Sequence, residues 1–198
     1  MRVTIIDYGA GNLHSLGKAL AVAADDVRVE ADPVRALDTD VLVLPGVGAF
    51  ASAAERLAAG RARLRAALHD GLPALGICLG MQLLFDASDE GTGVGLGLIA
   101  GRVTRLRASR VPQIGWNRIE DATDPLFAES GLEVAYYANG FACRADDPAS
   151  VIGWSTHGDD RFPAAVRSGR VLGVQFHPEK SSASGVRFLA RCLEEVVQ

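Results

Sequence analysis

The first half of the chain alternates between short runs typical of strands and longer runs typical of helices. The strand-like runs cover residues 3–6, 27–30, 41–44 and 73–77. Apolar residues with helical spacing fill 13–24, 53–68, with a weak point at Gly60, and 81–85. This alternation predicts an α/β fold whose open, mostly parallel sheet carries helices on both faces. In such sheets, functional sites form at the carboxyl ends of the strands.

The second half of the chain has shorter strand candidates separated by turns. They lie at 101–106, 113–119, 133–141, 151–155, 164–167 and 171–175, a pattern that predicts antiparallel hairpins added to the sheet. The glycine-rich stretch 91–101 is expected to be a loop. A closing helix is predicted over 181–197, with an apolar face made of Leu189, Cys192, Leu193 and Val196. No repeat or linker interrupts the sequence, so residues 1–198 are expected to form one domain.

Composition narrows the class of protein. The chain has 198 residues, 48% of them hydrophobic, with a net charge of −4, which suits one globular domain without a nucleic-acid partner. No apolar run approaches the roughly 20 residues that span a bilayer, and no signal-peptide pattern opens the chain. A cytoplasmic protein without a membrane partner is therefore expected. The odd number of cysteines, with no CxxC spacing, disfavours disulfides and a zinc site.

Two weak motifs fail on inspection. Gly9-Ala10-Gly11 begins a dinucleotide fingerprint, but the third glycine position holds His14. His177-Pro178-Glu179 has the H-x-E form of zinc deaminases, but no P-C-x-x-C follows it. Neither a nucleotide cofactor nor a metal is expected.

The strongest chemical signal is Gly76-Ile77-Cys78-Leu79-Gly80, which joins a strand candidate to a helix candidate. It has the G-x-nucleophile-x-G form of a nucleophile elbow, with cysteine in place of serine. The turn forces the nucleophile into a strained backbone conformation, and small flanking residues let strand and helix approach. At the start of a helix, the thiolate of Cys78 is favoured. The alternative is an ordinary buried cysteine in a small-residue turn.

A cysteine nucleophile needs a base, and a group that orients the base. The strand candidate 171–175 delivers His177 at the same sheet edge, and Glu179 can accept a hydrogen bond from its ring. An oxyanion hole could be formed by the Leu79 N–H and, after a peptide flip, by the Val47 N–H. Taken alone, His177 could be a capped strand end, and 45–48 a plain turn.

Three segments together resemble a known family. Residues 45–50 (PGVGAF), 76–82 (GICLGMQ) and 175–181 (QFHPEKS) are similar, in order and spacing, to the signatures of class I, triad-type glutamine amidotransferases. Residues 7–13 (DYGAGNL) and 112–117 (PQIGWN) resemble one branch of that family, the glutaminase subunits of imidazole glycerol phosphate synthases. The resemblance spans nearly the whole chain and implies a flavodoxin-like α/β fold.

The resemblance implies an amide hydrolysis without a cofactor. Cys78 would attack the side-chain amide of glutamine, His177 would pass a proton to the leaving ammonia, and Glu179 would orient His177. A glutamyl thioester would then be hydrolysed to glutamate. The residues expected to hold the oxyanion are Val47 and Leu79, and those matching the glutamine pocket are Gly48 and Gln82.

The resemblance also implies a partner. The family docks this subunit on a (β/α)8-barrel cyclase as a heterodimer, and the cyclase uses the ammonia to make imidazole glycerol phosphate in histidine biosynthesis. The matching interface positions are Asn12, Trp116 and Lys180. Lys180 is one of only two lysines, and a local ion pair with Asp7 is its alternative role.

One segment departs from the family pattern. Where the family usually has Tyr-Phe-Val-His-Ser-Tyr, residues 136–141 read Tyr-Tyr-Ala-Asn-Gly-Phe. Glutamine is therefore expected to be held mainly by the backbone of Asn139 and Gly140. Three alternatives stay open: a glutaminase for another synthase (pyridoxal phosphate or anthranilate), a silent amidotransferase-like regulatory module, and a cysteine peptidase.

Overall fold

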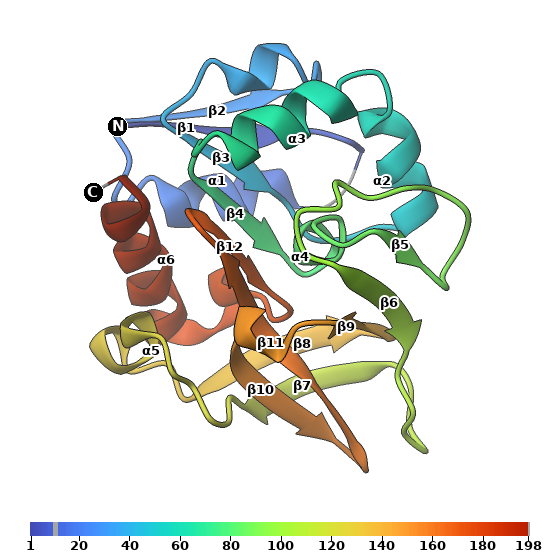
Figure 1. Ribbon diagram of the computed structural model, residues 1–198. Coiled ribbons are helices and arrows are strands. Elements are labelled where there is room, and N and C mark those ends of the chain that lie inside the picture. Colours follow the sequence, from blue (N-terminus) through green and yellow to red (C-terminus); the bar gives the residue numbers. More distant parts are fainter. Residues whose placement is uncertain (10–11, 198) are drawn as a thin grey trace.

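A seven-stranded sheet forms the centre of the molecule (Figure 1). The computed structural model describes residues 1–9 and 12–197; Ala10 and Gly11 of the DYGAGNL segment lie outside this description, as does the side chain of Val196. The strand order is β10-β11-β12-β4-β3-β1-β2. Five strands are parallel: β1 (Arg2–Ile6), β2 (Asp26–Glu30), β3 (Val41–Leu44), β4 (Ala74–Ile77) and β12 (Val171–Val174). At one edge, β10 (Val151–His157) and β11 (Asp160–Ser168) are antiparallel.

Helices cover both faces of the sheet because its central parallel strands β3, β4 and β12 are buried on both sides. On one face, Val3, Ile5 and Val43 pack with α1 (Leu13–Leu20) and α6 (Ser182–Val197). On the other face, Ile6, Leu42 and Leu44 pack with α2 (Phe50–Leu57), α3 (Arg61–His69) and the short α4 (Leu79–Gln82). The predicted α/β fold class, with helices on both faces, is confirmed. The closing helix is confirmed as α6, and Leu189, Cys192 and Leu193 are buried on it.

The expected helix over 53–68 is two helices in the structure. Gly60 lies between α2 and α3, packed so closely on Pro33 that a Cβ at this glycine would come within 2.6 Å of the proline ring. The helix expected over 81–85 is also shifted and shortened to α4. The contact between Gly60 and Pro33 joins segments that are distant in the sequence. It lies at the break between α2 and α3, which the local sequence pattern indicated only as a weak point of one helix.

Of the described strands in the second half of the chain, β10, β11 and β12 belong to the main sheet, and the others form two small sheets. Strand β6 (Gly101–Arg105) pairs with β5 (Ala87–Ser88) and β9 (Phe141–Ala145), whereas β7 (Gln113–Arg118) pairs only with β8 (Val134–Asn139). The single strand expected over 133–141 is therefore divided at Gly140 between two small sheets. The remaining regular elements are α5 (Pro125–Ser130) and the 3-10 turns η1 (Arg35–Leu37), η2 (Pro148–Ser150) and η3 (Pro178–Lys180).

The sheet register brings three segments together at the carboxyl ends of the central strands. Strand β4 lies between β3 and β12, with Leu44 opposite Gly76 and Val174 opposite Ile77. The Cys78 N–H continues the ladder by donating to the Val174 carbonyl at 2.7 Å. The turn after β3, the elbow after β4 and the segment after β12 therefore meet at one edge.

Candidate active site

Cys78 occupies a strained turn between β4 and α4. Its φ of +49° and ψ of −101° lie in a region that side-chain-bearing residues rarely adopt. A Cβ at Gly76 would lie 2.7 Å from the Gly80 carbonyl oxygen, and a Cβ at Gly80 would lie 2.0 Å from the Leu44 carbonyl oxygen. Both glycines are thus required by close backbone contacts, as expected for a nucleophile elbow, and the turn leaves Cys78 only 6% exposed.

His177 and Glu179 form a buried hydrogen-bonded pair beside Cys78. Nδ1 of His177 lies 2.9 Å from Oε1 of Glu179, and the histidine is 1% exposed. Burial alone would lower the pKa of His177, but interactions with Cys78 and Glu179 outweigh burial and raise this pKa to about 9. Since Glu179 occupies Nδ1, the other ring nitrogen, Nε2, is available to exchange a proton with the substrate or the thiol; Nε2 has no hydrogen-bond partner among the described residues.

The backbone of His177 is held by the β8 strand and by Ser181. Its N–H donates to the Tyr136 carbonyl at 2.8 Å, and its carbonyl accepts from the Ser181 hydroxyl at 2.7 Å. The Ser181 hydroxyl oxygen in turn accepts from the Tyr136 N–H at 2.9 Å. The β7–β8 hairpin therefore helps to fix the position of the imidazole.

The turn 45–48 passes directly beside the elbow. A Cβ at Gly46 would come within 2.4 Å of the Ile77 carbonyl oxygen, and Gly48 has a φ of +137°. Val47 is 40% exposed between these two glycines. The turn is thus confined to glycine on both sides of the valine that was expected to contribute to the oxyanion hole.

A cavity of about 180 Å³ opens at the elbow. It is lined by Gly46, Val47, Gly48, Cys78, Leu79, Gln82, Glu90, Ala138, Asn139, Gly140 and Phe141. Every residue that the sequence assigned to the oxyanion hole or the glutamine pocket is among them, together with Cys78. The structure therefore brings these predicted residues to a single cavity.

Two amide side chains shape the inner end of this cavity. Nε2 of Gln82 donates to the Phe141 carbonyl at 3.3 Å and to Oε1 of Gln175 at 3.2 Å. Nδ2 of Asn139 donates to the same Phe141 carbonyl at 3.0 Å, while its buried Oδ1 has no partner among the described residues. Asn139 thus presents a hydrogen-bond acceptor as well as backbone groups in this region.

Glu90 is a cavity residue that the sequence analysis did not identify. Its Oε2 accepts a hydrogen bond from the Phe50 N–H at the start of α2, at 2.9 Å. The sequence holds 24 acidic residues, and Glu90 lies in a polar stretch without a distinctive motif. Glu90 is distinguished from the other acidic residues by its position in the cavity, which results from the packing of the segment after α4 against α2.

The three residues expected at an interface are all exposed. The Asn12 side chain caps α1 by accepting from the Ser15 N–H at 3.2 Å. Trp116 is 55% exposed and makes an edge-to-face contact with Tyr136. Nζ of Lys180 lies 5.9 Å from the Tyr136 ring centroid, and no ion pair of Lys180 is found within residues 1–9 and 12–197, so the alternative pairing with Asp7 is not observed.

The other cysteines lack the features of a reactive site. Burial raises the pKa of both Cys143 and Cys192 well above the ordinary value for a thiol, which keeps them protonated. All three cysteines are free of disulfides. No cluster of three metal-ligating side chains occurs in the part of the chain that the structure describes.

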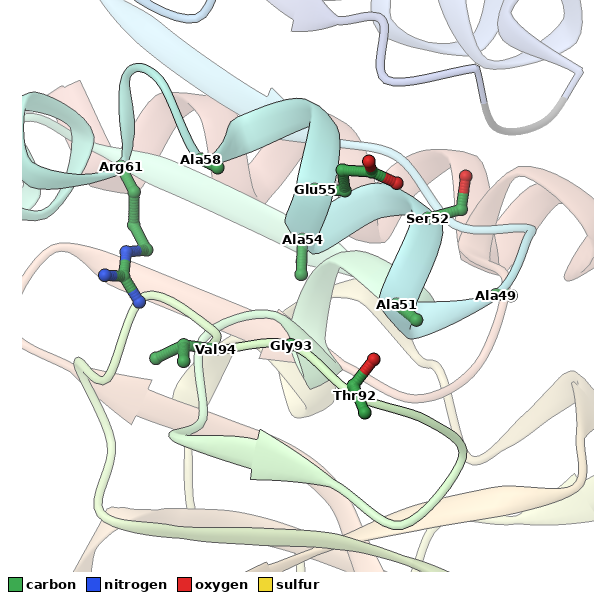
Figure 2. Close-up of a pocket in the computed structure, with 10 residues that line it drawn as sticks. All are labelled: Ala49, Ala51, Ser52, Ala54, Glu55, Ala58, Arg61, Thr92, Gly93 and Val94. Atoms are coloured by element: carbon green, nitrogen blue, oxygen red, sulfur yellow. The ribbon is translucent and has the colours of Figure 1, made fainter.

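A larger hollow of about 690 Å³ lies elsewhere, between α2 and the segment 92–94 (Figure 2). Four of its ten lining residues are alanines, the charged ones are Glu55 and Arg61, and no cysteine or histidine lines it. The hollow therefore has no counterpart of the cysteine and histidine found at the elbow.

Comparison with known proteins identifies the class to which this fold and site belong. Residues 4–196 match the family described as glutamine amidotransferase class-I, and the chain belongs to that family. It is 45% identical to the imidazole glycerol phosphate synthase subunit HisH of Symbiobacterium thermophilum, over 96% of this chain and 92% of the relative. It is 42% identical to the subunit of the same name from Halobacterium salinarum, over 94% of this chain and 90% of the relative. Within the class, the chain is a member of this HisH family, as the sequence resemblance indicated.

Solved structures share the fold at lower identity. A glutamine amidotransferase crystal structure superposes with a TM-score of 0.75 at 19% identity, covering 98% of both chains. The structure of PurLQS from Thermotoga maritima superposes with a TM-score of 0.74 at 21% identity, again covering 98% of both chains. Separately, none of the helices within the described residues has the length and apolar character needed to cross a membrane.

Proposed function

We propose that this chain is the glutaminase subunit of an imidazole glycerol phosphate synthase, with Cys78, His177 and Glu179 as its catalytic residues. One observation carries the proposal: the elbow cysteine, which lines the cavity, and the Glu179-bound histidine follow adjacent parallel strands and interact with each other. Family membership supplies the substrate class, because the relatives are subunits of imidazole glycerol phosphate synthase. Glutamate and ammonia are the expected products.

In the proposed reaction, the Cys78 thiolate attacks the side-chain carbonyl carbon of glutamine. The carbonyl oxygen becomes an oxyanion, which the Leu79 N–H and the Val47 N–H would stabilise. Protonated His177 gives its Nε2 proton to the amide nitrogen, so the C–N bond breaks and ammonia leaves. Water then attacks the thioester, with His177 accepting its proton, and glutamate is released as the thiolate is restored.

Substrate binding would use the remaining residues of the cavity. Gln82, Asn139 and the backbone of Gly48 and Gly140 offer hydrogen-bonding groups to the amide and carboxylate of glutamine. Glu90 adds a carboxylate at the rim, suited to the positively charged α-amino group. This assignment adds Glu90 to the residues expected from the sequence.

Ammonia released into water would be protonated and lost as a nucleophile, so a partner that receives it is expected. We assign this role to a (β/α)8-barrel cyclase bound as a heterodimer in histidine biosynthesis, acting in the cytoplasm. Ile114 and Trp116, which are 69% and 55% exposed on β7, supply apolar surface for docking, with Asn12 and Lys180 as further contacts. A glutaminase for another synthase is not favoured, because the HisH relatives match over nearly the full chain.

The test is a glutaminase assay of the chain alone and with the cyclase of the same organism. Wild-type complex should hydrolyse glutamine and form imidazole glycerol phosphate from it. Cys78→Ala should abolish both reactions, while its complex should still use added ammonium salt. Retention of glutamine hydrolysis by Cys78→Ala would exclude the triad assignment, and an inactive wild-type complex would instead favour a silent module.

A further inference from the structure

Gln175 is a fully buried polar residue for which the mechanism above has no role. It follows β12 and lies two residues before His177. Its Nε2 lies 3.5 Å from the Cys78 sulfur, and its Oε1 accepts from Nε2 of Gln82 at 3.2 Å. One amide group therefore contacts the nucleophile at one end and a residue of the substrate cavity at the other.

A backbone carbonyl fixes the direction of both hydrogen bonds. The carbonyl of Phe141 can only accept, so the Gln82 amide must turn its NH₂ group toward it. The same NH₂ group donates to Gln175, whose oxygen must therefore face Gln82. The NH₂ group of Gln175 is then left facing the sulfur. The network itself determines the orientation of both amides.

A donor aimed at sulfur discriminates between the two forms of a cysteine. A thiolate accepts a hydrogen bond more strongly than a thiol does, and hydrogen bonds to charged groups are the stronger class. Cys78 is nearly excluded from water, so few solvent donors compete with Gln175. The contact also fixes the direction of the sulfur, because the Gln175 amide approaches it from the end of β12, the strand that leads to His177.

We propose that Gln175 is a positioning residue that stabilises and aims the Cys78 thiolate, and that Gln82 locks the Gln175 amide in the donating orientation. This inference rests on the proposed glutaminase function. It gives Gln82 a second role, in which a residue of the substrate cavity also prepares the nucleophile.

The test separates an effect on the sulfur from an effect on folding. The backbone N–H of Gln175 donates to the Ala164 carbonyl, a bond that any replacement except proline keeps. Gln175→Met preserves side-chain length and removes only the amide. We expect alkylation of Cys78 by iodoacetamide at pH 7 to slow about tenfold, which corresponds to about 1.4 kcal/mol. The kcat should fall by a similar factor, with the KM for glutamine changed less than about twofold.

A matched control and a double mutant sharpen the result. Gln113 is another buried glutamine, on β7 rather than at the sulfur, and Gln113→Met should leave alkylation unchanged. Gln82→Met should slow alkylation in the wild-type background, because it frees the Gln175 amide to rotate. In the Gln175→Met background the same change should have no further effect.

Gln175→Glu serves as a second variant if Gln175→Met does not fold. The introduced carboxylate can still accept a hydrogen bond from Gln82, but it places a negatively charged oxygen at the sulfur. Because this charge disfavours the thiolate of Cys78, alkylation should slow more than tenfold. Wild-type alkylation rates in a folded Gln175 variant, or additive effects of the Gln82 and Gln175 changes, would overturn the inference. Alkylation by iodoacetamide does not require a glutamine site. If the Gln175 variants are alkylated slowly but the wild-type enzyme does not hydrolyse glutamine, the proposed glutaminase function is rejected and the role of Gln175 at the sulfur stands.

Discussion

The hydroxyl of Tyr8 donates a hydrogen bond to the carbonyl oxygen of Pro45. Tyr8 lies just after β1, in the segment that leads to Asn12, and Pro45 opens the turn that carries Val47. Burial raises the pKa of Tyr8 well above its ordinary value, with the nearby Cys78 adding to the rise, so the phenol stays a neutral donor. The contact therefore ties the end of the first strand segment, at Tyr8, to the turn that carries Val47, the residue expected in the oxyanion hole.

Removing this donor should loosen the turn. Tyr8→Phe leaves the Pro45 carbonyl without its partner, which should lower the free energy of unfolding by about 1–3 kcal/mol. Since the Gly46–Val47 peptide is then less restrained, glutaminase activity without the cyclase should rise, and the ratio of stimulated to basal activity should fall. Denaturant unfolding and paired assays measure both effects. An unchanged ratio in a destabilised variant would show that the contact serves stability alone.

The raised pKa of His177 predicts a loss of activity at alkaline pH. In the proposed mechanism the protonated imidazole supplies the proton to the leaving ammonia, so kcat should fall as pH rises through about 9. Protonated His177 also stabilises the folded protein. This contribution is fully present below about pH 6.5, the ordinary pKa of histidine, and is lost as the pH rises through about 9. Measurements of kcat against pH, with NMR titration of the His177 ring, test both statements.

Glu179→Gln provides the matched comparison. It keeps the side-chain shape but removes the negative charge next to Nδ1, one of the interactions that raise the pKa of His177. The alkaline fall in kcat should therefore move to lower pH. A pH profile that is unchanged in this variant would mean that another group controls the alkaline limb.

Lys180 is expected to act in communication with the cyclase. Its ammonium lies over the ring of Tyr136, whose backbone holds His177 in place. Lys180→Ala should reduce stimulation by the cyclase more than it reduces basal hydrolysis. The control is Lys18→Ala, because Lys18 is the other lysine and lies exposed on α1. Equal losses of basal and stimulated activity in Lys180→Ala would refute the communication role.

Two glycines of the same cavity should respond differently to substitution. A Cβ at Gly46 would meet the Ile77 carbonyl oxygen at 2.4 Å, so Gly46→Ala must displace backbone beside the nucleophile. A loss of about a hundredfold in kcat/KM is expected, as for other small misplacements of reacting groups.

A Cβ at Gly140 would make only ordinary contacts, the nearest at 3.7 Å to Val111. Gly140→Ser should therefore change the KM for glutamine by less than about tenfold, the scale of one neutral hydrogen bond. Steady-state kinetics of both variants decide the comparison. A large gain in activity from Gly140→Ser would indicate that the natural 136–141 segment binds glutamine poorly.

The sequence by itself determined the α/β class of the fold and the tight strand-to-helix turn at Cys78. Apolar runs identified the central parallel strands β3, β4 and β12, because strands buried on both faces leave continuous apolar runs. The glycines flanking Cys78 were equally informative, since a strand-to-helix turn of that tightness requires them locally. The pairing of His177 with Glu179 could be predicted because they lie two residues apart at the end of a strand, where local geometry brings their side chains into hydrogen-bonding distance.

The tertiary structure decided the features that depend on contacts between distant segments. The division of 133–141 at Gly140 follows from pairing with two different partner strands. The cavity position of Glu90 follows from packing against α2, and the contact of Gln175 with Cys78 follows from the alignment of β12 and β4. Sequence periodicity describes one segment at a time, whereas these contacts depend on strand register and packing between segments, which only the assembled sheet fixes.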